Sequence, residues 1–505
     1  MTTGAAETTR RMLLPRTGAP AIAHARGRSA DNVDVLLNLV TLPLGAAAFD
    51  GLPQPARWRE LHDRASAKSG SVRSLVLGNR RHTLAVIGYL RKDASAFERL
   101  SLAGRMLKEA AGREPQTVGL AAQGTAALEA LLAATLTHAF ALPSLRSPAR
   151  GERRIGRIVL FGAADFDPAY EAVVAEGTNL ARWLTALPPN ILDARGYRTA
   201  ISELAQRHQL GLRWYDERAL KRLGANAFLA VAAANQQPGA GIAHLSYRPG
   251  RARGGSPEVA LVGKGIIFDT GGINLKTHRY MLDMHTDMSG SAVALATLVA
   301  LKQLRAPFAA DAWLAITENR IGPHGYKPQD VIRAVNGVTI QVIHSDAEGR
   351  MALADTLALA ARTRPRLLLD FATLTGACVY ALTERMSGVF ANRDSLVPQL
   401  LAAGSASGER VWNFPLAEDY DQDIESKVAD IAQCAVEGKG DHIHATRFLS
   451  RFVPATIPWV HVDLSSATRT GGLAHVPTDV TGFGVRFAVE LLLRQGLLGA
   501  LEGRG

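Results

Sequence analysis

Two segments of the chain concentrate the residue types that could carry chemistry. One runs from Gly263 to Asp287 and the other, SDAEGR, from Ser345 to Arg350, and together they hold five acidic residues and four Lys or Arg. Each begins beside a strongly apolar run, which is typical of a buried strand that opens into a site. Because a bare buried charge costs several kcal/mol unless it is paired or bound to a metal, the two segments predict a metal centre.

The carboxylates in these segments have the chemistry of metal ligands. Asp269 follows an apolar strand pattern at the turn TGG, and the ends of parallel strands are where α/β folds bind ligands. Asp346 and Glu348 lie two residues apart, so an extended backbone would point both to one face. With Asp287 they offer four oxygen-donating side chains without cysteine or a histidine pair. This set suits divalent ions such as Mn, Mg or Zn.

Two lysines accompany the acids, and their role has two readings. Lys264 precedes Asp269 by five residues and Lys276 follows it by seven. A lysine among carboxylates is usually an ion-pair partner. A desolvated lysine beside a cation can instead lose its proton and become a metal ligand. Composition alone leaves both readings open.

The elements that must position these residues alternate between strands and helices. The chain has 505 residues, which is too long for one typical core. Runs with continuous rather than alternating apolar residues predict sheets that are covered on both faces. We therefore expect an α/β protein with a smaller N-terminal α/β domain and a larger C-terminal α/β domain, whose central sheet is mostly parallel and covered by helices.

The expected boundaries follow these patterns. The prediction is a disordered leader at 1–28, a basic N-terminal domain at 29–166, a linker helix at 167–185 and a catalytic domain at 186–505. Strand patterns occur at 32–40, 71–79, 82–90, 154–163, 210–216, 242–249, 258–268, 309–318, 337–345, 367–376 and 459–466. Helical patterns occur at 94–111, 125–140, 168–187, 197–208, 289–304, 353–362 and 483–494.

The cysteine count and the apolar segments predict the cellular compartment of the protein. Only two cysteines occur, Cys378 and Cys434, so neither a disulfide framework nor a cysteine metal site is expected. The most apolar stretch, 120–142, contains Gln, Glu and His and is too polar for a membrane span. The first 28 residues carry five Arg but no continuous apolar core of a secretory signal. We expect a cytoplasmic protein without a membrane segment, with an organelle transit peptide as the lesser alternative.

The net charge of +11 belongs almost entirely to the first third of the chain. Residues 1–165 hold 23 Lys and Arg against 13 Asp and Glu, or +10, which leaves 34 against 33, or +1, for the rest. Such asymmetry can indicate an anionic partner such as nucleic acid. No aromatic-interleaved basic motif accompanies it, so a solvated basic surface is the favoured interpretation and nucleic-acid binding the alternative.

The chemistry-bearing strings resemble the leucine aminopeptidase (cytosol aminopeptidase) family of dinuclear metallo-exopeptidases. The resemblance is carried by VGKGIIFDTGGINLK, by the DM that begins at Asp287, by SDAEGRMALADTLALA from Ser345 and by ATLTGA from Ala372. Weaker likeness extends to LPPN, SKVAD and TGFGVR, so that it covers about residues 170–495. The first domain resembles the variable N-terminal domain of the family only in position and class.

The resemblance implies a set of metal ligands. Lys264, Asp269, Asp287 and Glu348 would hold one ion, while Asp269, Asp346 and Glu348 would hold the other. Two ions that share carboxylates can position and acidify a water and polarise a peptide carbonyl. One ion would also take the free α-amine of the substrate. The implied cofactors are two divalent ions per subunit, Mn or Zn, with Mg or Co as alternatives.

The resemblance also implies catalytic and substrate-binding residues. Lys276 would stabilise the oxyanion, and Arg350 would hold a bidentate bicarbonate that acts as general base. The residues that match the substrate pocket are Met284, Thr373, Leu374 and Gly376, with Leu374 matching through its backbone carbonyl. The expected function is removal of N-terminal residues from peptides, preferably apolar ones such as Leu, by a homohexamer. The alternative is a DNA-binding or regulatory protein with an aminopeptidase fold that acts through its basic first domain.

Some positions depart from the pattern of that family. Thr277 follows the oxyanion lysine where proline is common, and Ser289 replaces a common glycine. His344 stands where asparagine is frequent, and His285 lies in the changed stretch before Asp287. Either histidine could hydrogen-bond a metal ligand, although a structural role is favoured for both. The HIHA run at 442–445 is interpreted as structural, and none of these changes removes a predicted ligand.

Overall fold

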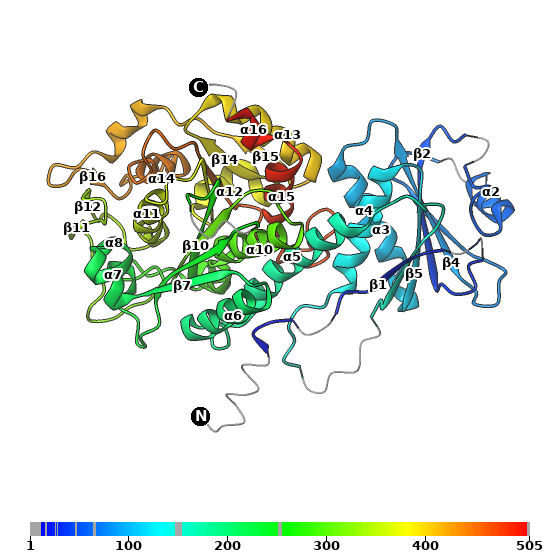
Figure 1. The fold of residues 1–505 in the computed structure, drawn as a ribbon, viewed down its shortest axis with the longest axis horizontal. Coiled ribbons are helices and arrows are strands. Elements are labelled where there is room, and N and C mark those ends of the chain that lie inside the picture. Colours follow the sequence, from blue (N-terminus) through cyan, green and yellow to red (C-terminus); the bar gives the residue numbers. More distant parts are fainter. Residues whose placement is uncertain are drawn as a thin grey trace.

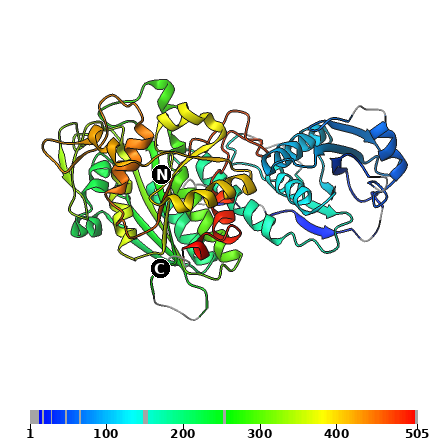
Figure 2. The ribbon, with the colours of Figure 1, turned by 90° about the horizontal axis from the view of Figure 1, so that it is seen from above.

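The computed structural model describes residues 12–15, 18–25, 27, 29–45, 48–63, 67–146, 154–250 and 255–501. Within this part of the chain two bodies lie side by side, a smaller one formed by the first third and a larger one formed by the rest (Figure 1). The helix α5 (Ala169–Ala186) lies between them in both views (Figures 1 and 2). The predicted α/β class with a smaller and a larger domain is therefore confirmed.

The smaller domain is a six-stranded sheet of order β1-β6-β5-β2-β4-β3, in which only β3 and β4 pair antiparallel. Successive side chains of β2 enter opposite cores: Leu37 packs with α3 and α4, and Leu36 with α2. Both faces are covered, which explains the continuous apolar run. The bounds are β1 (Ala21–His24), β2 (Val35–Leu42), β3 (Val72–Val76), β4 (Leu84–Arg91), β5 (Thr117–Ala122), β6 (Arg157–Leu160), α2 (Pro55–Asp63), α3 (Ala96–Ala110), η1 (Ala111–Arg113) and α4 (Thr125–Ala139).

Two predictions for this domain are wrong. The leader at 1–28 was expected to be disordered, but Ala21–His24 forms β1 and pairs in parallel with β6. Leu13 and Leu14 are buried in the core of the larger domain. Arginines interrupt the apolar residues of this segment, so its pattern was too short to predict a strand; residues 1–11, 16–17, 26 and 28 lie outside the described part. The apolar stretch 120–142 is also not helical throughout, because β5 extends to Ala122, whereas the helix expected at 125–140 is confirmed by α4.

The larger domain is built on an eight-stranded sheet of order β15-β14-β17-β13-β9-β10-β8-β7. Its centre, from β17 to β10, is parallel, while β14–β17, β10–β8 and β8–β7 pair antiparallel. The strands are β7 (Gly211–Asp216), β8 (Gly241–Tyr247), β9 (Val259–Asp269), β10 (Ala310–Asn319), β13 (Leu367–Ala372), β14 (Ser387–Ala391), β15 (Val411–Asn413) and β17 (Trp459–Asp463). The central strands are buried almost without interruption, as their sequences predict.

Helices cover both faces of this sheet. One core joins the sheet to α5, α6, α10 and α15, and a second core joins the opposite face to α8, α11 and α14. Figure 1 shows α10 between the sheet and α5. The helices are α6 (Ala194–Arg207), α7 (Glu217–Leu223), α8 (Asn226–Ala232), α9 (His278–Met281), α10 (Ser289–Gln303), α11 (Glu348–Ala361), α12 (Gly376–Leu382), α13 (Val397–Ser407), α14 (Asp441–Ser450), α15 (Val485–Leu493) and α16 (Leu497–Ala500). Short 3-10 turns are η2 (Met284–Thr286), η3 (Thr383–Arg385), η4 (Asp394–Leu396) and η5 (Glu418–Ile424).

Two element predictions in this domain are corrected. The strand expected at 337–345 is only β12 (Thr339–Gln341), which belongs to a separate small sheet with β11 (Val331–Arg333) and β16 (Ile431–Ala432). The helix expected at 353–362 begins earlier, at Glu348. The first turn of α11 contains charged residues, so apolar periodicity alone does not predict where the helix begins. No helix among the described residues has the length and apolar character that crossing a membrane requires.

Candidate metal centre

The predicted acidic residues meet at one end of the central strands. Asp269 is the last residue of β9, Asp287 directly follows η2, and Glu348 is the first residue of α11. Asp346 lies in the turn between β12 and α11. Carboxylate oxygens of Asp269, Asp346 and Glu348 lie within 4.8 Å of one another. This is the carboxyl edge of the sheet, where α/β folds place ligands.

The extended backbone expected between Asp346 and Glu348 is wrong, although the two side chains do come together. Asp346 lies in a turn and Glu348 opens α11. The turn is fixed by Ser345, whose hydroxyl donates to the carbonyl of Gly271 (2.7 Å) and accepts from the N–H of Asn274 (2.8 Å). This cross-link brings the loop after β9 against the loop before α11. The metal-binding geometry therefore depends on contact between two distant loops.

Each lysine bridges two carboxylates in the described structure. Lys264 Nζ lies 2.8 Å from Asp287 and 3.0 Å from Glu348, and it also donates to the carbonyl of Thr373 (2.8 Å). Lys276 Nζ lies 2.9 Å from Asp269 and 2.5 Å from Asp346. In this arrangement both lysines act as ion-pair partners of the acids.

The centre is short of positive charge. Burial raises the pKa of Asp287 to about 8 and that of Asp346 to about 7, and it also raises the pKa of Glu348. Neighbouring carboxylates raise the pKa values of these three acids as well, and the two ammonium groups compensate only in part. The Oε2 atom of Glu348 is buried and makes no hydrogen bond within the described residues. Clustered oxygen donors with too little compensating charge fit divalent cations.

Supporting hydrogen bonds orient the acids, and one of the donors, Asn319, was not predicted from the sequence. Asp269 Oδ1 accepts from the N–H of Gly271 and from the amide of Asn319, both at 2.8 Å. Asp287 Oδ1 accepts from the hydroxyl of Thr373 at 2.7 Å. Asn319 ends β10, the neighbour of β9, and a polar residue at the end of an apolar strand was the available signal. Such contacts hold ligands in place before an ion binds.

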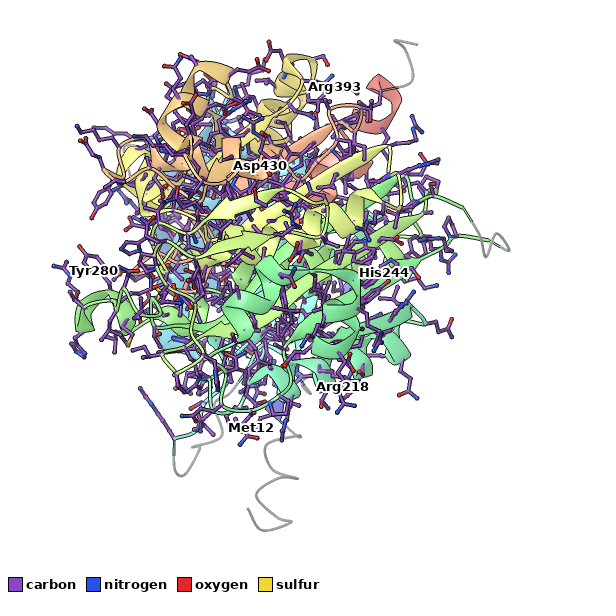
Figure 3. The ribbon with its side chains drawn as sticks, turned by 90° about the vertical axis from the view of Figure 1, so that its left-hand side faces the viewer. Met12, Arg218, His244, Tyr280, Arg393 and Asp430 are labelled. Atoms are coloured by element: carbon purple, nitrogen blue, oxygen red, sulfur yellow. The ribbon has the colours of Figure 1, made fainter. Side chains whose placement is uncertain are left out.

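A cavity of about 830 Å³ opens over these residues. Its lining includes all of the predicted metal ligands and the predicted substrate-binding residues Met284, Thr373, Leu374 and Gly376. Sequence reasoning missed Tyr280, Tyr380 and Glu384, which also line it. Tyr280 is 60% exposed and projects from the edge of the molecule in Figure 3. The cavity is thus open to solvent and large enough for the end of a peptide.

Asp463 is a further residue of this cavity that the sequence analysis did not select. Its Oδ1 accepts from the N–H of Leu374 (3.1 Å), and its Oδ2 accepts from the hydroxyl of Thr375 (2.7 Å). It ends β17 as Asp269 ends β9, so an acid at the end of an apolar strand was again the signal. Asp463 fixes the loop that contains Leu374 beside the cavity.

Arg350 does not join the cavity lining. It is buried on α11, and its Nη1 donates to the carbonyl of Gln433 at 3.2 Å. Its Nη2 donates to both carboxylate oxygens of Asp441, each at 2.8 Å. The predicted anion-binding arginine therefore already has a carboxylate partner, which belongs to α14.

The two histidines and the two other positions that depart from the family pattern lie beside the centre or at the starts of nearby helices. His344 lines the cavity, and its Nδ1 accepts from the N–H of Asp346 at 3.2 Å; burial lowers its pKa. Burial also lowers the pKa of His285, which lies in η2. Ser289 donates to the carbonyl of Thr286 at the start of α10. Thr277 precedes α9 as its N-cap.

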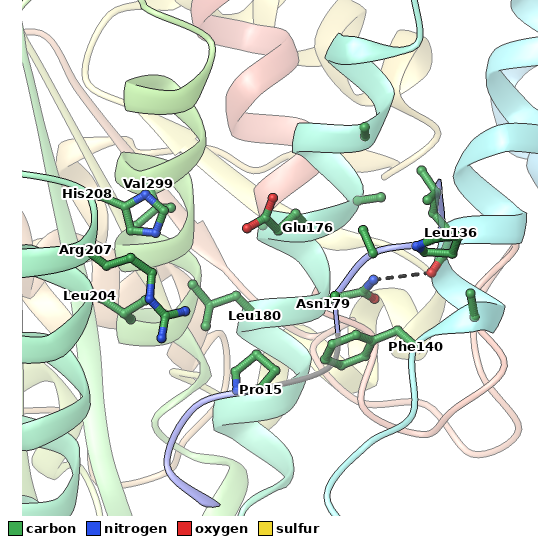
Figure 4. Close-up of a pocket in the computed structure, with 17 residues that line it drawn as sticks. Pro15, Leu136, Phe140, Glu176, Asn179, Leu180, Leu204, Arg207, His208 and Val299 are labelled. Carbon is green, nitrogen blue, oxygen red and sulfur yellow. Dashed lines mark hydrogen bonds between the residues drawn. The ribbon is translucent and has the colours of Figure 1, made fainter. Parts of the chain in front are cut away.

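A second cavity, of about 300 Å³, lies away from the acids at the junction of α4, α5 and α6. Figure 4 shows Glu176, Asn179 and Arg207 around it. Glu176 and Arg207 have partners already, since Glu176 accepts from Gln303 and Arg207 pairs with Glu203. Among its described lining residues the cavity has no group of acids comparable with the cluster at β9, so the larger cavity is the candidate functional site.

The comparisons with known proteins agree with this geometry. The model of the cytosol aminopeptidase family, catalytic domain, matches residues 179–489.

The chain belongs to the cytosol aminopeptidase family.

The relatives of this family include a probable cytosol aminopeptidase of Sulfurihydrogenibium sp. (strain YO3AOP1), 36% identical over 324 residues, or 64% of each chain. One from Methylorubrum extorquens is 34% identical over 476 residues, 90% of this chain and 93% of the relative. The match therefore spans less than two thirds of the first relative and nearly all of the second. The resemblance inferred from the motifs is confirmed.

Solved structures extend the likeness to both domains. The apo leucyl aminopeptidase from Trypanosoma cruzi superposes with a TM-score of 0.83 at 25% identity, covering 97% of this chain and all of the other (100%). The bottromycin maturation enzyme BotP, in complex with Mn, gives a TM-score of 0.78 at 29% identity, covering 91% of this chain and 98% of the other. The complete two-domain fold is thus shared with a leucyl aminopeptidase of known structure.

Proposed function

We propose that this chain is a metal-dependent aminopeptidase that hydrolyses the N-terminal peptide bond of peptides. The observation that carries the proposal is the buried carboxylate cluster, which is short of positive charge and lies at the floor of an open cavity. Membership of the cytosol aminopeptidase family supports it. Two cations bound beneath a peptide-sized cavity would supply the chemistry that such hydrolysis uses.

The proposed ligands are those implied by the family motifs. Lys264, Asp269, Asp287 and Glu348 would hold one divalent ion, and Asp269, Asp346 and Glu348 the other. Bound ions would supply Lewis-acid polarisation of the scissile carbonyl and an acidified water. Lys264 would bind as a neutral amine, which requires loss of a proton from the ammonium that contacts Asp287 and Glu348. Mn or Zn is the proposed physiological ion, with Mg or Co as alternatives.

The chain's own residues would bind and orient the substrate. Lys276 lies at the cavity floor, where its ammonium can stabilise a developing oxyanion. The loop of Leu374 is held by Asp463, so that the carbonyl of Leu374 can accept a hydrogen bond from the substrate. Met284, Thr373 and Gly376 would form the side-chain pocket, with an apolar residue such as Leu preferred.

The wider proposal concerns assembly, location and the general base. A homohexamer is proposed from the family resemblance, and a cytoplasmic location because the relatives are named cytosol aminopeptidases. The resemblance also implies bicarbonate at Arg350 as the general base, but Asp441 already contacts that guanidinium, so bicarbonate is not part of this proposal. The nucleic-acid alternative depended on the charge of the first domain alone, and neither the cavity nor the family match supports it.

The proposal is tested by hydrolysis of leucyl-p-nitroanilide with metal-stripped protein. Mn, Zn, Mg and Co are restored singly, and an N-acetylated substrate serves as the blocked control. We expect metal-dependent release that acetylation abolishes, because the free α-amine is a ligand in the proposed complex. The absence of release with every ion would contradict the proposal.

Variants connect that activity to the carboxylate cluster. Asp269→Asn should lose bound metal and lower kcat/KM by more than about a hundredfold, since even residues that only support metal ligands contribute roughly 10–100-fold. Asp283→Asn is the matched control, because Asp283 is an exposed acid near the same cavity and is not a proposed ligand. Metal content is measured by mass spectrometry. Equal loss in both variants would argue against a specific centre.

A further inference from the structure

The pairing of Arg350 with Asp441 is a feature of this chain that the family motifs do not predict. Arg350 is 2% exposed, and Asp441 is the first residue of α14. The Nη2 atom lies 2.8 Å from each oxygen of that carboxylate. Because both partners are charged, such hydrogen bonds are roughly twice as strong as those between neutral groups.

Two of the three guanidinium nitrogens of Arg350 already have partners. Its Nη1 is occupied by the carbonyl of Gln433. Its Nε is buried and makes no hydrogen bond within the described part of the chain. The side chain of Gln433 is fixed in turn, since its Oε1 accepts from the N–H groups of Ile343 and His344 at 3.1 Å. The guanidinium is therefore held in one orientation, with Asp441 on its anion-binding side.

The local structure of α14 commits Asp441 to this partner. Gly440 precedes it with a φ of 65°, a left-handed conformation that lets the chain turn directly into the helix. The neighbouring cation, Lys439, pairs instead with Glu437 at 2.7 Å. In the described structure the ion pair of Asp441 is thus the one with Arg350.

A carboxylate and a bicarbonate present the same pair of oxygens on one carbon, so they compete for the same face of a guanidinium. A second anion beside Asp441 would add a like charge near a single cation, which is unfavourable in a buried setting. The side chain of Asp441 is 25% exposed, whereas that of Arg350 is 3% exposed. Asp441 is thus the more exposed member of the pair, and an anion that replaced it would take its position beside Arg350.

We propose that Asp441 takes the place of free bicarbonate at Arg350, so that this chain neither binds bicarbonate there nor needs it for turnover. The proposal rests on the proposed aminopeptidase function. Asp441 and Arg350 do not line the cavity, so Asp441 acts as a positioning residue that neutralises Arg350 and not as a group that touches substrate. The other residues assigned to the centre keep their proposed roles.

Bicarbonate binding tests the proposal without requiring turnover. Titration calorimetry is performed with metal-stripped wild-type protein and with Asp441→Ala and Asp441→Asn, after circular dichroism has shown that each is folded. We expect no detectable bicarbonate binding by the wild type and measurable binding by Asp441→Ala, because an unpaired buried cation recruits an anion. The affinity of the variant for bicarbonate should exceed that of the wild type by roughly tenfold or more. Binding of bicarbonate by the wild type, or its absence in both folded variants, would overturn the proposal.

Enzyme activity provides the second readout, and a second ion pair of α14 provides a matched control. Asp421 pairs with Arg447 of the same helix through two contacts of 2.7 and 2.6 Å. We expect Asp441→Ala to be less active than the wild type without bicarbonate and to regain activity when bicarbonate is added. Bicarbonate should leave the activities of the wild type and of Asp421→Asn unchanged. Equal bicarbonate binding by Asp421→Asn would show that any unpaired arginine suffices and would overturn the special role of Asp441.

The binding experiment and the activity experiment together distinguish failure of this inference from failure of the proposed function. A wild-type protein that is inactive with every metal would contradict the aminopeptidase proposal, while the binding experiment would still decide whether Asp441 excludes bicarbonate. An active wild-type protein that bicarbonate stimulates would contradict this inference and leave the aminopeptidase proposal intact. A purely structural role for Asp441 would lower stability without conferring bicarbonate binding, and that result also overturns the inference.

Discussion

At the scale of single residues, the centre places acids together at a cost to stability. Asp287 and Glu348 share the ammonium of Lys264, and Asp269 and Asp346 share that of Lys276. Burial favours the protonated forms of Asp287, Asp346 and Glu348, which is why the pKa of Asp287 rises to about 8. The cluster is suited to receive cations, and without them its like charges oppose one another.

This cost makes the stability of the metal-free protein depend on pH. The pKa values of Asp287 and Asp346 are higher in the folded protein, at about 8 and 7, than the ordinary value of 3.8. Between these values the folded state binds more protons than the unfolded state, so stability must fall as pH rises. We expect the melting temperature in EDTA to decrease from about pH 4 to about pH 8. Differential scanning fluorimetry measures it.

Added Mn should oppose the fall in melting temperature with pH, because the ion takes the place of the protons on Asp287 and Asp346. The increase in melting temperature on adding Mn should grow with pH over the same interval. Asp287→Asn removes a titrating group and should flatten the profile of the metal-free protein, whereas the exposed Asp283→Asn should not. An unchanged slope in Asp287→Asn would contradict the assignment.

At the scale of elements, the centre depends on helices that approach the sheet closely. A Cβ on Gly263 of β9 would lie 2.5 Å from the Cα of Ser291 in α10. A Cβ on Gly349 of α11 would lie 2.5 Å from the Cε of Lys264. The contact at Gly263 is with backbone atoms and requires glycine, whereas a side chain at Gly349 would displace the end of the Lys264 side chain. These close approaches bring the first turns of α10 and α11, and with them Asp287 and Glu348, against the end of β9.

Gly290→Ala should therefore destabilise the larger domain. Its Cβ would overlap the carbonyl oxygen of Phe371 in β13, so α10 would have to move away from the sheet. We expect a loss of about 1–3 kcal/mol, the usual cost of overpacking, although alanine is the better helix former. Gly112→Ala is the control, because nothing lies within 4 Å of that position. Urea unfolding measures both, and equal stability of the two variants would contradict the packing argument.

At the scale of the whole molecule, the beginning of the described chain connects both domains. Leu13 and Leu14 are buried with α5 and α6 of the larger domain, and the carbonyl of Met12 accepts from the indole N–H of Trp183 at 3.1 Å. Figure 3 shows Met12 at the lower edge of the larger body. A few residues later, β1 adds to the sheet of the smaller domain. The interface is reinforced by Arg410, whose guanidinium lies 3.8 Å from the centre of the Phe97 ring.

The double variant Leu13→Ala, Leu14→Ala tests this connection. Both side chains are buried, so each truncation should cost about 2–5 kcal/mol by leaving a cavity. Leu145→Ala, at a position that is 58% exposed, should have little effect. Thermal unfolding of the wild type and the two variants measures this. A melting temperature that the double variant leaves unchanged would show that the segment adds no stability.

The sequence by itself determined the class of fold, the central strands and the residues of the centre. Continuous apolar runs such as Val259–Asp269 are sufficient to predict buried parallel strands, because only a sheet covered on both faces buries them. The motif residues, including Lys264 and Asp269, were selected because their types and order are specific. These properties are local, and local pattern is what a sequence displays.

Only the tertiary structure decided which distant groups meet. Asn319 supports Asp269 from a neighbouring strand, and Asp441 reaches Arg350 from a helix 91 residues further along the chain. The short strand β1 likewise pairs with β6, which lies more than 130 residues further along the chain. Contacts of this kind are fixed by strand order and by the packing of loops, which no local pattern encodes. The sequence therefore determined the parts of the site, and the tertiary structure decided what each part is bound to.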